Sequence, residues 1–235
     1  MTVTVKDIND APTANNDRIG ETPNLILEDS VDNIVDVLGN DSSAPDQNEE
    51  ISLVAAGFTQ PMNGTVTLSA SNEVLYTPDP NFFGEDSFTY TIIDNHPDNP
   101  LTASASVFVL VSPENDPPTA NDDPNLTVAQ NTTAVMLDLL SNDSSEPDTG
   151  ETLTITGVSN VTGSVTVTVA GDGMSVLYTP VPGFLGTDTF SYVISDGNGG
   201  EATANVIVEV VAFIPGSLSG LVYADDNFDG VHNAN

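Results

Sequence analysis

The chain has 235 residues, of which 35 are Asp or Glu and only two are Lys or Arg, so its formal net charge is −33. Such a chain has no basic surface for phosphates, which excludes nucleic-acid binding, and an anionic membrane surface would repel it. It contains no Cys and two His, which excludes disulfides, zinc-thiolate sites and cysteine nucleophiles and argues against histidine-rich metal sites. No apolar stretch approaches the length of a membrane span, so we expect no direct membrane insertion.

The charge does not imply disorder. Hydrophobic residues make up 38% of the chain and occur in short alternating runs rich in Val, Ile, Thr, Phe and Tyr, whereas disordered chains combine high charge with low hydrophobicity. Because so many carboxylates have almost no counter-charge within the chain, they repel one another. Bound cations or a salty medium would relieve that repulsion, and both indicate a secreted or cell-surface location.

The chain contains two copies of one pattern, which self-comparison reveals before any element is assigned. The block LGNDSS at Leu38–Ser43 returns as LSNDSS at Leu140–Ser145, and VLYTP at Val74–Pro78 returns unchanged at Val176–Pro180. Each copy has about a hundred residues, the usual size of one domain. The copies differ in length only in loops, as two copies of one domain should.

In chain order, each copy predicts short strands between turn residues. In copy one the expected strands are Leu25–Leu27, Ile34–Leu38, Ile51–Phe58, Thr65–Leu68, Val74–Thr77, Ser87–Ile93 and Thr102–Val111, and copy two repeats them. Asn63-Gly64 and the loop Asp196–Gly200 are hairpin turn signals, because Asn and Gly tolerate positive φ angles. No window shows a long helical period. The pattern therefore predicts an all-β chain of tandem antiparallel β-sandwiches of the immunoglobulin type.

Most aromatic residues are expected in the core. They fall in the buried phase of the strand alternation, at Tyr76, Phe88 and Tyr90 and again at Tyr178, Phe190 and Tyr192. A carbohydrate-binding module would instead need exposed aromatics grouped on one sheet face or loop end.

The repeats and the composition divide the chain into four segments. These are 1–10, the last strand and linker of an upstream repeat; 11–114, repeat one; 115–214, repeat two; and 215–235, the start of a different domain. We therefore expect the chain to be a segment of a longer protein.

The linker Asp7-Ile8-Asn9-Asp10-Ala11-Pro12 resembles the inter-domain motif of cadherins. The blocks LGNDSSAPD, VLYTPDPNFFGEDSFTYTI and SDGNGGEATANVIVEV resemble bacterial cadherin-like immunoglobulin repeats, which form tandem arrays on large secreted adhesins. The resemblance covers roughly Ala11 to Val211. It implies cadherin-like sandwiches whose partners are neighbouring repeats of the same chain, stiffened by extracellular Ca²⁺, in a rod that spaces or presents an adhesive tip.

The segment after Val211 is not a third copy, and from Gly216 it resembles the opening of the B-type repeats of serine–aspartate surface proteins. Its Asp-x-Asn-x-Asp-Gly run matches positions 1, 3, 5 and 6 of an EF-hand-type calcium loop. The expected ligands are Asp225, Asn227, Asp229, the backbone carbonyl of Val231, and Asn233. The bidentate Glu of such loops would lie one residue beyond Asn235.

Further calcium ligands are expected in loops rich in Asp and Asn, because calcium takes six to eight oxygens from carboxylates, amides and backbone carbonyls. The first junction set is Asp7, Asn9 and Asp10 followed by Asp17, and the second is Glu114, Asn115 and Asp116 followed by Asp123. A loop set in each copy adds Asp41, Asp46 and Glu49, then Asp143, Asp148 and Glu151. A solvated linker is the alternative for the junctions, and turn or capping roles are the alternative for the loops.

The second junction departs from the cadherin pattern. Pro113 stands where the first junction has Asp7, and Glu28-Asp29 of copy one becomes Gln130-Asn131 in copy two. Both changes remove formal charge, so the sequence favours calcium at the first junction and leaves calcium and a solvated linker equally open at the second.

The sequence favours a non-catalytic spacer or adhesion segment of a large bacterial extracellular protein, which would contact a cell-surface protein or a polysaccharide. Paired carboxylates also occur in glycosidases, but here they recur in both copies, and the only histidines, His96 and His232, form no Ser-His-Asp set. Two alternatives stay open. One is a non-catalytic accessory segment of a large secreted enzyme, and the other is a carbohydrate-binding module.

Overall fold

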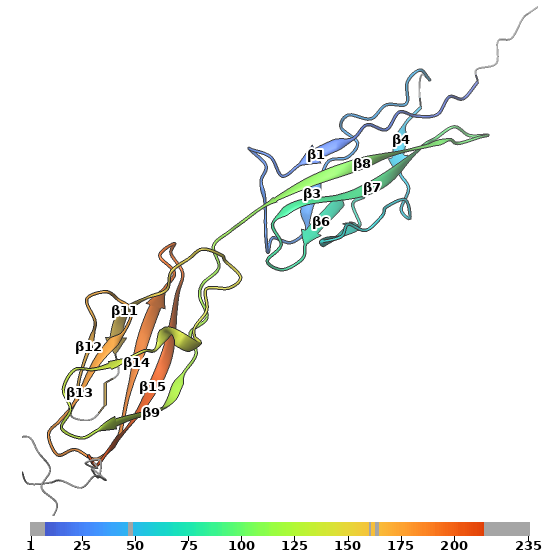
Figure 1. Cartoon of the computed structure of the whole chain (residues 1–235). Helices are drawn as coiled ribbons and strands as arrows, with labels where there is room; N and C mark the ends of the chain where they lie inside the picture. The colour runs from blue at the N-terminus through green and yellow to red at the C-terminus, as the bar shows by residue number, and fades with distance from the viewer. Residues whose placement is uncertain (1–7, 47–48, 160, 163–164, 214–235) are drawn as a thin grey trace, which may run out of the picture. The chain divides into compact units, whose positions relative to one another are not determined.

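The computed structural model describes residues 8–46, 49–159, 161–162 and 165–213. The chain divides into two compact units, Met1–Asn115 and Asp116–Asn235, which are called repeat 1 and repeat 2 and are described separately. Within the described ranges they contain β-strands and one 3₁₀ turn but no α-helix (Figure 1), which confirms the all-β class. No helix in that part of the chain is long and apolar enough to cross a membrane.

The described part of repeat 1 contains eight strands. They are β1 Asp17–Ile19, β2 Ile26–Leu27, β3 Asn33–Val35, β4 Ile51–Leu53, β5 Gly64–Leu68, β6 Val74–Pro78, β7 Gly84–Asp94 and β8 Thr102–Ser112. Repeat 2 continues the numbering with β9 Asp123–Ala129, β10 Val135–Leu137, η1 Leu140–Asn142, β11 Thr154–Ser159, β12 Val165–Val169, β13 Val176–Pro180, β14 Gly186–Ser195 and β15 Glu201–Val211.

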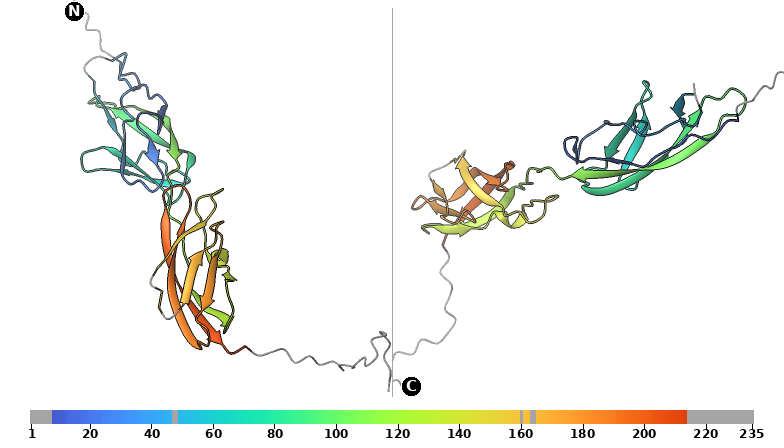
Figure 2. Two further views of the ribbon diagram at one scale, coloured as in Figure 1. Left: turned by 90° about the vertical axis from the view of Figure 1, so that its left-hand side faces the viewer. Right: turned by 90° about the horizontal axis from the view of Figure 1, so that it is seen from above.

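Each repeat combines a larger sheet with a three-stranded sheet. In repeat 1 the strand orders are β1-β8-β7-β4, with β2 also paired to β8, and β3-β6-β5. In repeat 2 they are β11-β14-β15-β9 and β10-β13-β12. Figure 2 shows each repeat from two further directions, with the long antiparallel hairpins β7–β8 and β14–β15 running along it.

Strict alternation of side chains builds the core between the two sheets. In β6 the side chains of Val74, Tyr76 and Pro78 are buried and those between them are half-buried, and β13 repeats the pattern. Tyr76 and Tyr90 are fully buried, as are their counterparts in repeat 2. Tyr76 stacks on Phe88, with ring centroids 6.4 Å apart. The predicted core role of these aromatics is confirmed.

The first strand of each repeat runs parallel to its last strand. In repeat 1, β1 pairs with Val107–Val109 of β8, and β2 pairs with the end of the same strand. In repeat 2, β9 pairs with β15 in the same way. This pairing carries acidic residues from the start of each repeat, among them Asp17 and Glu28, alongside its final strand.

Several details differ from the sequence prediction. The strand predicted at Ile51–Phe58 is shorter, because β4 ends at Leu53. Asn63-Gly64 forms no hairpin turn, because Gly64 is already the first residue of β5, and the β5–β6 turn lies at Ser69–Glu73 with Asn72 at φ 62°. Strand β1 was not predicted, because it has only three residues and carries the exposed Arg18. The loop Asp196–Gly200 does connect β14 to β15.

Candidate cation sites

The residues expected to bind calcium fall into two clusters in each repeat. The linker-end cluster is Asn9, Asp10, Asp46 and Asp94 in repeat 1, and Asp116, Asp148, Glu151 and Asp196 in repeat 2. The flank cluster is Asp17, Asp36 and Asp41 around Tyr90 in repeat 1, and Asp123, Asp138 and Asp143 around Tyr192 in repeat 2.

In repeat 1 the linker-end cluster ties the linker to two loops. The backbone amide of Asp10 donates to Asp46 Oδ2 at 2.8 Å. The side-chain amide of Asn9 donates to Asp94 Oδ2 at 3.2 Å and to the backbone carbonyl of Asn99 at 2.7 Å. The structure therefore brings three residues named by the sequence, Asn9, Asp10 and Asp46, to one end of the repeat, together with Asp94.

Repeat 2 ties its linker to a loop through the corresponding contact. The Asp116 backbone amide donates to Asp148 Oδ2 at 2.7 Å, as Asp10 does to Asp46. The side-chain amide of Asn198 donates to Glu151 Oε1 at 2.6 Å, and the backbone amide of Asn198 donates to Asp196 Oδ1 at 2.7 Å.

The sequence did not predict Asp94 and Asp196 as ligands. In the structure both are buried, and each is only 3% exposed. Their signal is positional, since Asp94 ends β7 and Asp196 directly follows β14. Burial acts to raise the pKa of Asp94, but hydrogen bonds from the backbone amides of Leu101 and His96 and from Asn9 outweigh it, so the pKa is lowered. This carboxylate is therefore held ionised beside the linker.

Two buried oxygens bear on whether the linker-end clusters could bind a cation. Asn9 Oδ1 and Glu151 Oε2 are buried and accept no hydrogen bond from the described residues. A buried oxygen without a donor is costly, and amide and carboxylate oxygens are what calcium binds, so these donor sets fit a hard cation. In the described ranges, however, no three acidic or histidine side chains are arranged to hold a metal alone. An ion here would also need amide or backbone carbonyl oxygens.

The flank cluster of repeat 1 is organised by a tyrosine. The hydroxyl of the fully buried Tyr90 donates to Asp41 Oδ2 at 2.9 Å and lies 3.0 Å from the Asn15 carbonyl oxygen. The backbone amide of Asn15 donates to Asp41 Oδ1 at 2.7 Å. Asp17, on β1, is 8% exposed, and its Oδ2 meets no donor in the described part of the chain.

Repeat 2 repeats this geometry. The Tyr192 hydroxyl donates to Asp143 Oδ2 at 2.9 Å, and the backbone amide of Asn121 donates to Asp143 Oδ1 at 2.7 Å. Asp123, on β9, is half-buried, and its Oδ2 is buried with no donor among the residues described.

The aspartates on the first strands have raised pKa values. Burial is the main cause for Asp17, whose pKa is raised to about 6; the Tyr90 hydroxyl and the Asn40 amide oppose the rise, and the charges of Asp41 and Asp36 add to it. The pKa of Asp123 is likewise raised to about 6, mainly by burial and further by Asp143, Asp122 and Asp138. The pKa values of Tyr90 and Tyr192 are raised by burial and by these carboxylates, so both hydroxyls keep their protons.

These positions correct the grouping predicted from the sequence. Asp17 and Asp123 were grouped with the linkers, but they lie with Asp41 and Asp143, because β1 and β9 pass beside those loops. The loop pair Asp41 and Asp46 is divided between the two clusters, as is the corresponding pair in repeat 2.

Glu28 also has a different place from the one the sequence suggested. It is 2% exposed, its backbone amide donates to the Ser112 carbonyl, and its Oε1 accepts the Glu114 backbone amide at 2.7 Å. Glu28 therefore adds a buried carboxylate beside Glu114, at the end of repeat 1. Repeat 2 has Gln130 at the position of Glu28. The missing charge is therefore at the end of repeat 2 and not at the second junction.

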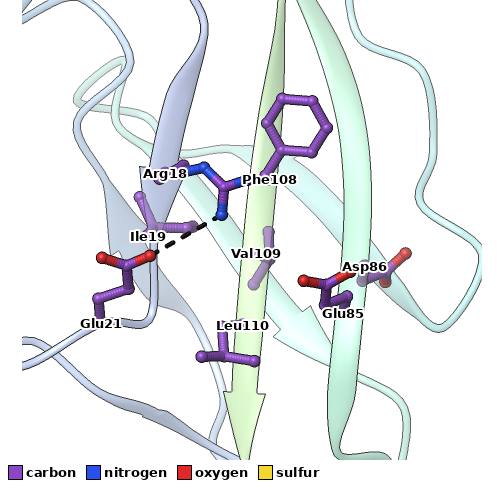
Figure 3. Close-up of a pocket in the computed structure, with 8 residues that line it drawn as sticks. All are labelled: Arg18, Ile19, Glu21, Glu85, Asp86, Phe108, Val109 and Leu110. Atoms are coloured by element: carbon purple, nitrogen blue, oxygen red, sulfur yellow. Dashed lines mark ion pairs between the residues drawn. The ribbon is translucent and has the colours of Figure 1, made fainter.

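Figure 3 shows a pocket of about 300 Å³ beside β1 and β8, lined by Arg18, Glu21 and Phe108, with Glu85 from β7 on its other side. The Arg18 guanidinium carbon lies 5.4 Å from the Phe108 ring centroid, and its Nη1 lies 3.9 Å from Glu21 Oε1. Both charged side chains are largely exposed, so this ion pair contributes little to stability. The pocket pairs no nucleophile with a base.

Six predicted ligands lie outside the described residues. They are Asp7 of the first linker and, in the EF-hand-like run, Asp225, Asn227, Asp229, Val231 and Asn233.

The amino-acid sequence of each repeat matches one known domain family. The model of the bacterial Ig domain matches residues 9–109 and again residues 115–209. The chain belongs to the bacterial Ig domain family. A search of curated proteins finds no match.

Solved structures extend this likeness to cadherins. Mouse cadherin-23, repeats EC22–24, matches with a TM-score of 0.51 and 20% identity, covering 88% of this chain and 67% of that one. Drosophila N-cadherin, repeats EC1–4, matches with a TM-score of 0.49 and 15% identity, covering 71% of this chain and 43% of that one. The likeness to cadherin-23, at 20% identity, shows the fold alone, and together with the two family matches it gives a tandem pair of immunoglobulin- and cadherin-like sandwiches.

Proposed function

We propose that this segment is a spacer or adhesion segment of a large bacterial protein, secreted or displayed at the cell surface, with Ca²⁺ bound at the linker end of each repeat. Tandem Ig repeats are an architecture for spacing and presenting other parts of a chain. The observation that carries the calcium part is the pair of donorless buried oxygens, Asn9 Oδ1 and Glu151 Oε2, at the same end of the two repeats.

The cation would be held by the linker together with the loops it contacts. In repeat 2 the ligands would come from Asp116, Asp148, Glu151 and Asp196, and in repeat 1 from Asn9, Asp10, Asp46 and Asp94. Calcium there would neutralise clustered carboxylates and replace hydrogen bonds that the protein does not supply. Because the linker itself provides ligands, binding would restrict its backbone and stiffen the connection to the preceding repeat.

Neighbouring repeats of the same chain are the partners this proposal requires. A cell-surface protein or a polysaccharide is the proposed target of the whole protein. The net charge of −33 supports an extracellular setting, because millimolar divalent cations and salt are available there to offset it.

Backbone ¹⁵N relaxation of the full chain tests whether calcium stiffens the linker. In calcium chloride we expect both repeats to tumble with the rotational correlation time of one 24.4 kDa body. In EDTA at matched ionic strength each repeat should tumble faster and independently. Independent tumbling in both conditions would exclude the stiffening role.

A variant separates a specific site from general charge screening. Asp148→Asn combined with Glu151→Gln removes two carboxylates from the linker-end cluster of repeat 2 and should abolish the calcium effect on tumbling. Exposed Asp172→Asn, in the β12–β13 turn, serves as the charge-matched control and should behave like the unmodified chain. Equal behaviour of the two variants would mean that calcium acts only by screening.

A further inference from the structure

The flank cluster of repeat 1 contains a carboxylate oxygen that the protein places but does not satisfy. Asp17 is 8% exposed, and its Oδ2 has no hydrogen-bond donor within the described residues. The nearest strong donor, the Tyr90 hydroxyl, is directed instead to Asp41, at 2.9 Å from Oδ2 and 3.1 Å from Oδ1. Two carboxylates therefore share one small region, where Asp36 adds a third negative charge.

The same arrangement occurs in repeat 2 on an independent stretch of sequence. Asp123 Oδ2 is buried without a donor in the described part of that repeat, and the Tyr192 hydroxyl is again directed to the neighbouring carboxylate, Asp143. Asp138 stands where repeat 1 has Asp36. A single misplaced side chain would not produce the same unsatisfied oxygen twice, so the arrangement belongs to the repeat.

Among the residues that the structure describes, no basic side chain neutralises these carboxylates. Arg18 is the only Lys or Arg among the described residues, and its side chain points to Phe108 and Glu21. A buried, unpaired carboxylate beside like charges is unfavourable unless a counter-ion is bound. The local oxygens are carboxylates together with the backbone carbonyl of Asn15, or of Asn121 and Leu139 in repeat 2, a set typical of hard cations.

We propose that the flank cluster of each repeat is a second divalent-cation site, selective for Ca²⁺-like hard ions and separate from the linker-end cluster. In repeat 1 the protein ligands would include the Asp17 and Asp41 carboxylates, and in repeat 2 those of Asp123 and Asp143. This proposal does not depend on the linker function, because all of these residues lie within a single repeat.

Such a site would fasten the first strand of each repeat. Asp17 lies on β1 and Asp123 on β9, whereas Asp41 and Asp143 lie in the loop after the third element. Strand β1 has only three residues and pairs only with β8. A cation shared between the strand and the loop would therefore hold this edge strand against both sheets.

The tyrosine within each cluster provides a direct readout. Terbium binds calcium sites, and a tyrosine close to the ion sensitises its luminescence. The full chain is titrated with terbium chloride, excited at the tyrosine band and then competed with calcium chloride. The tested variant is Asp17→Asn with Asp123→Asn, and the control is Asp46→Asn with Asp148→Asn, which alters only the linker-end clusters.

We expect the flank variant to lose most of the sensitised emission and to bind two fewer calcium ions by calorimetry, while the linker-end control keeps the emission. Because Asn is isosteric and uncharged, the flank variant should melt in EDTA no lower than the unmodified chain. Unchanged emission and ion count in the flank variant would overturn the proposal. Loss of ions only in the linker-end control would support the linker function and overturn the flank site.

A second variant keeps the test decisive if the flank variant does not fold. Tyr90→Phe with Tyr192→Phe retains every carboxylate but removes the tyrosine from each flank cluster. It should bind as many calcium ions as the unmodified chain and lose the part of the terbium emission that the flank variant loses. Emission equal to that of the unmodified chain would show that the sensitised ion lies elsewhere and would overturn the proposal.

Discussion

The linker-end and flank clusters hold their carboxylates in place by different means. At the linker end a backbone amide of the linker donates to a loop carboxylate, from Asp10 to Asp46 in repeat 1, and the corresponding contact recurs in repeat 2. In the flank cluster a buried tyrosine hydroxyl donates to a carboxylate of the same repeat, from Tyr90 to Asp41, and this contact also recurs in repeat 2. The first contact therefore ties the linker to its repeat, whereas the second ties the core of a repeat to one of its own loops.

The largest expected effect is on the stability of repeat 2 and concerns Gly200, which packs against Asp196 and the linker residue Pro117. A Cβ added at Gly200 would lie 2.0 Å from Asp196 Oδ2 and 2.8 Å from the backbone of Pro117. Gly200→Ala should therefore destabilise repeat 2 by about 1–3 kcal/mol, measured by urea unfolding. Gly171→Ala is the control, because a Cβ there meets nothing within 4 Å. Equal stability of the two variants would show that the linker end rearranges freely.

The next prediction compares the two linkers directly. The sequence favours calcium at the first junction, which by itself predicts that Asp10→Asn weakens the calcium effect more than Asp116→Asn. Burial favours the opposite order, because Asp10 is exposed whereas Asp116 is half-buried. Calcium at a hundredfold excess over its Kd should add about 2.7 kcal/mol to the stability of the repeat that binds it. Melting in calcium chloride against EDTA should show the larger loss for Asp116→Asn, and a larger loss for Asp10→Asn would restore the order given by the sequence.

When cations are removed, the flank clusters should make the folded state more stable at pH 5 than at pH 7. The pKa values of Asp17 and Asp123 are raised to about 6 from an ordinary 3.8. The folded state therefore takes up protons before the unfolded state does, so stability rises as pH falls from 7 to 5 and is lost again as pH rises through 6. The gain should be about 1–2 kcal/mol for Asp17.

Urea unfolding in EDTA at pH 7, 6 and 5 measures this dependence. Asp17→Asn with Asp123→Asn should flatten it, because the groups with raised pKa values are gone. The same slope in both proteins would assign the effect to the overall charge of the chain.

The smallest effect concerns the position where the repeats differ in charge. Glu28→Gln should change the stability of repeat 1 by less than about 1 kcal/mol, because the Gln side-chain oxygen still accepts the Glu114 amide and repeat 2 already carries Gln130 here. Thermal melting in EDTA measures this change. A loss above about 2 kcal/mol in EDTA would mean that the charge of Glu28 supports the fold itself.

The fold was predictable because its signals are local and repeated. The alternation in Val74–Pro78, which recurs unchanged in repeat 2, indicates the strands, the core tyrosines and the tandem organisation from the sequence alone. The sites were only partly predictable, because they depend on which loops meet. Asp17 stands close to the linker in sequence, yet the parallel pairing of β1 with β8 moves it to Asp41. A three-residue strand with an exposed middle residue gives too weak a pattern to predict that pairing.

Asp94 and Asp196 were missed for a related reason. Each lies where a strand ends, a place where an Asp is ordinarily a turn residue. Only the burial of its carboxylate distinguishes a candidate cation ligand from such a turn residue. Burial at a loop depends on what packs over it, which sequence alternation does not report. Recurrence of the Asp at the end of the first strand of the long hairpin in both repeats was the available signal.

The parallel pairing of first and last strands has a mechanical consequence. If a repeat is pulled by its two ends, the force enters β1 near its start and leaves β8 at its end, so the paired strands are driven past each other along their length. The hydrogen bonds between them then carry the load together and must break together, whereas strands pulled apart from one end lose their bonds one at a time. Forced unfolding is governed by the barrier to the first rupture, so this geometry favours a repeat that holds its length under tension.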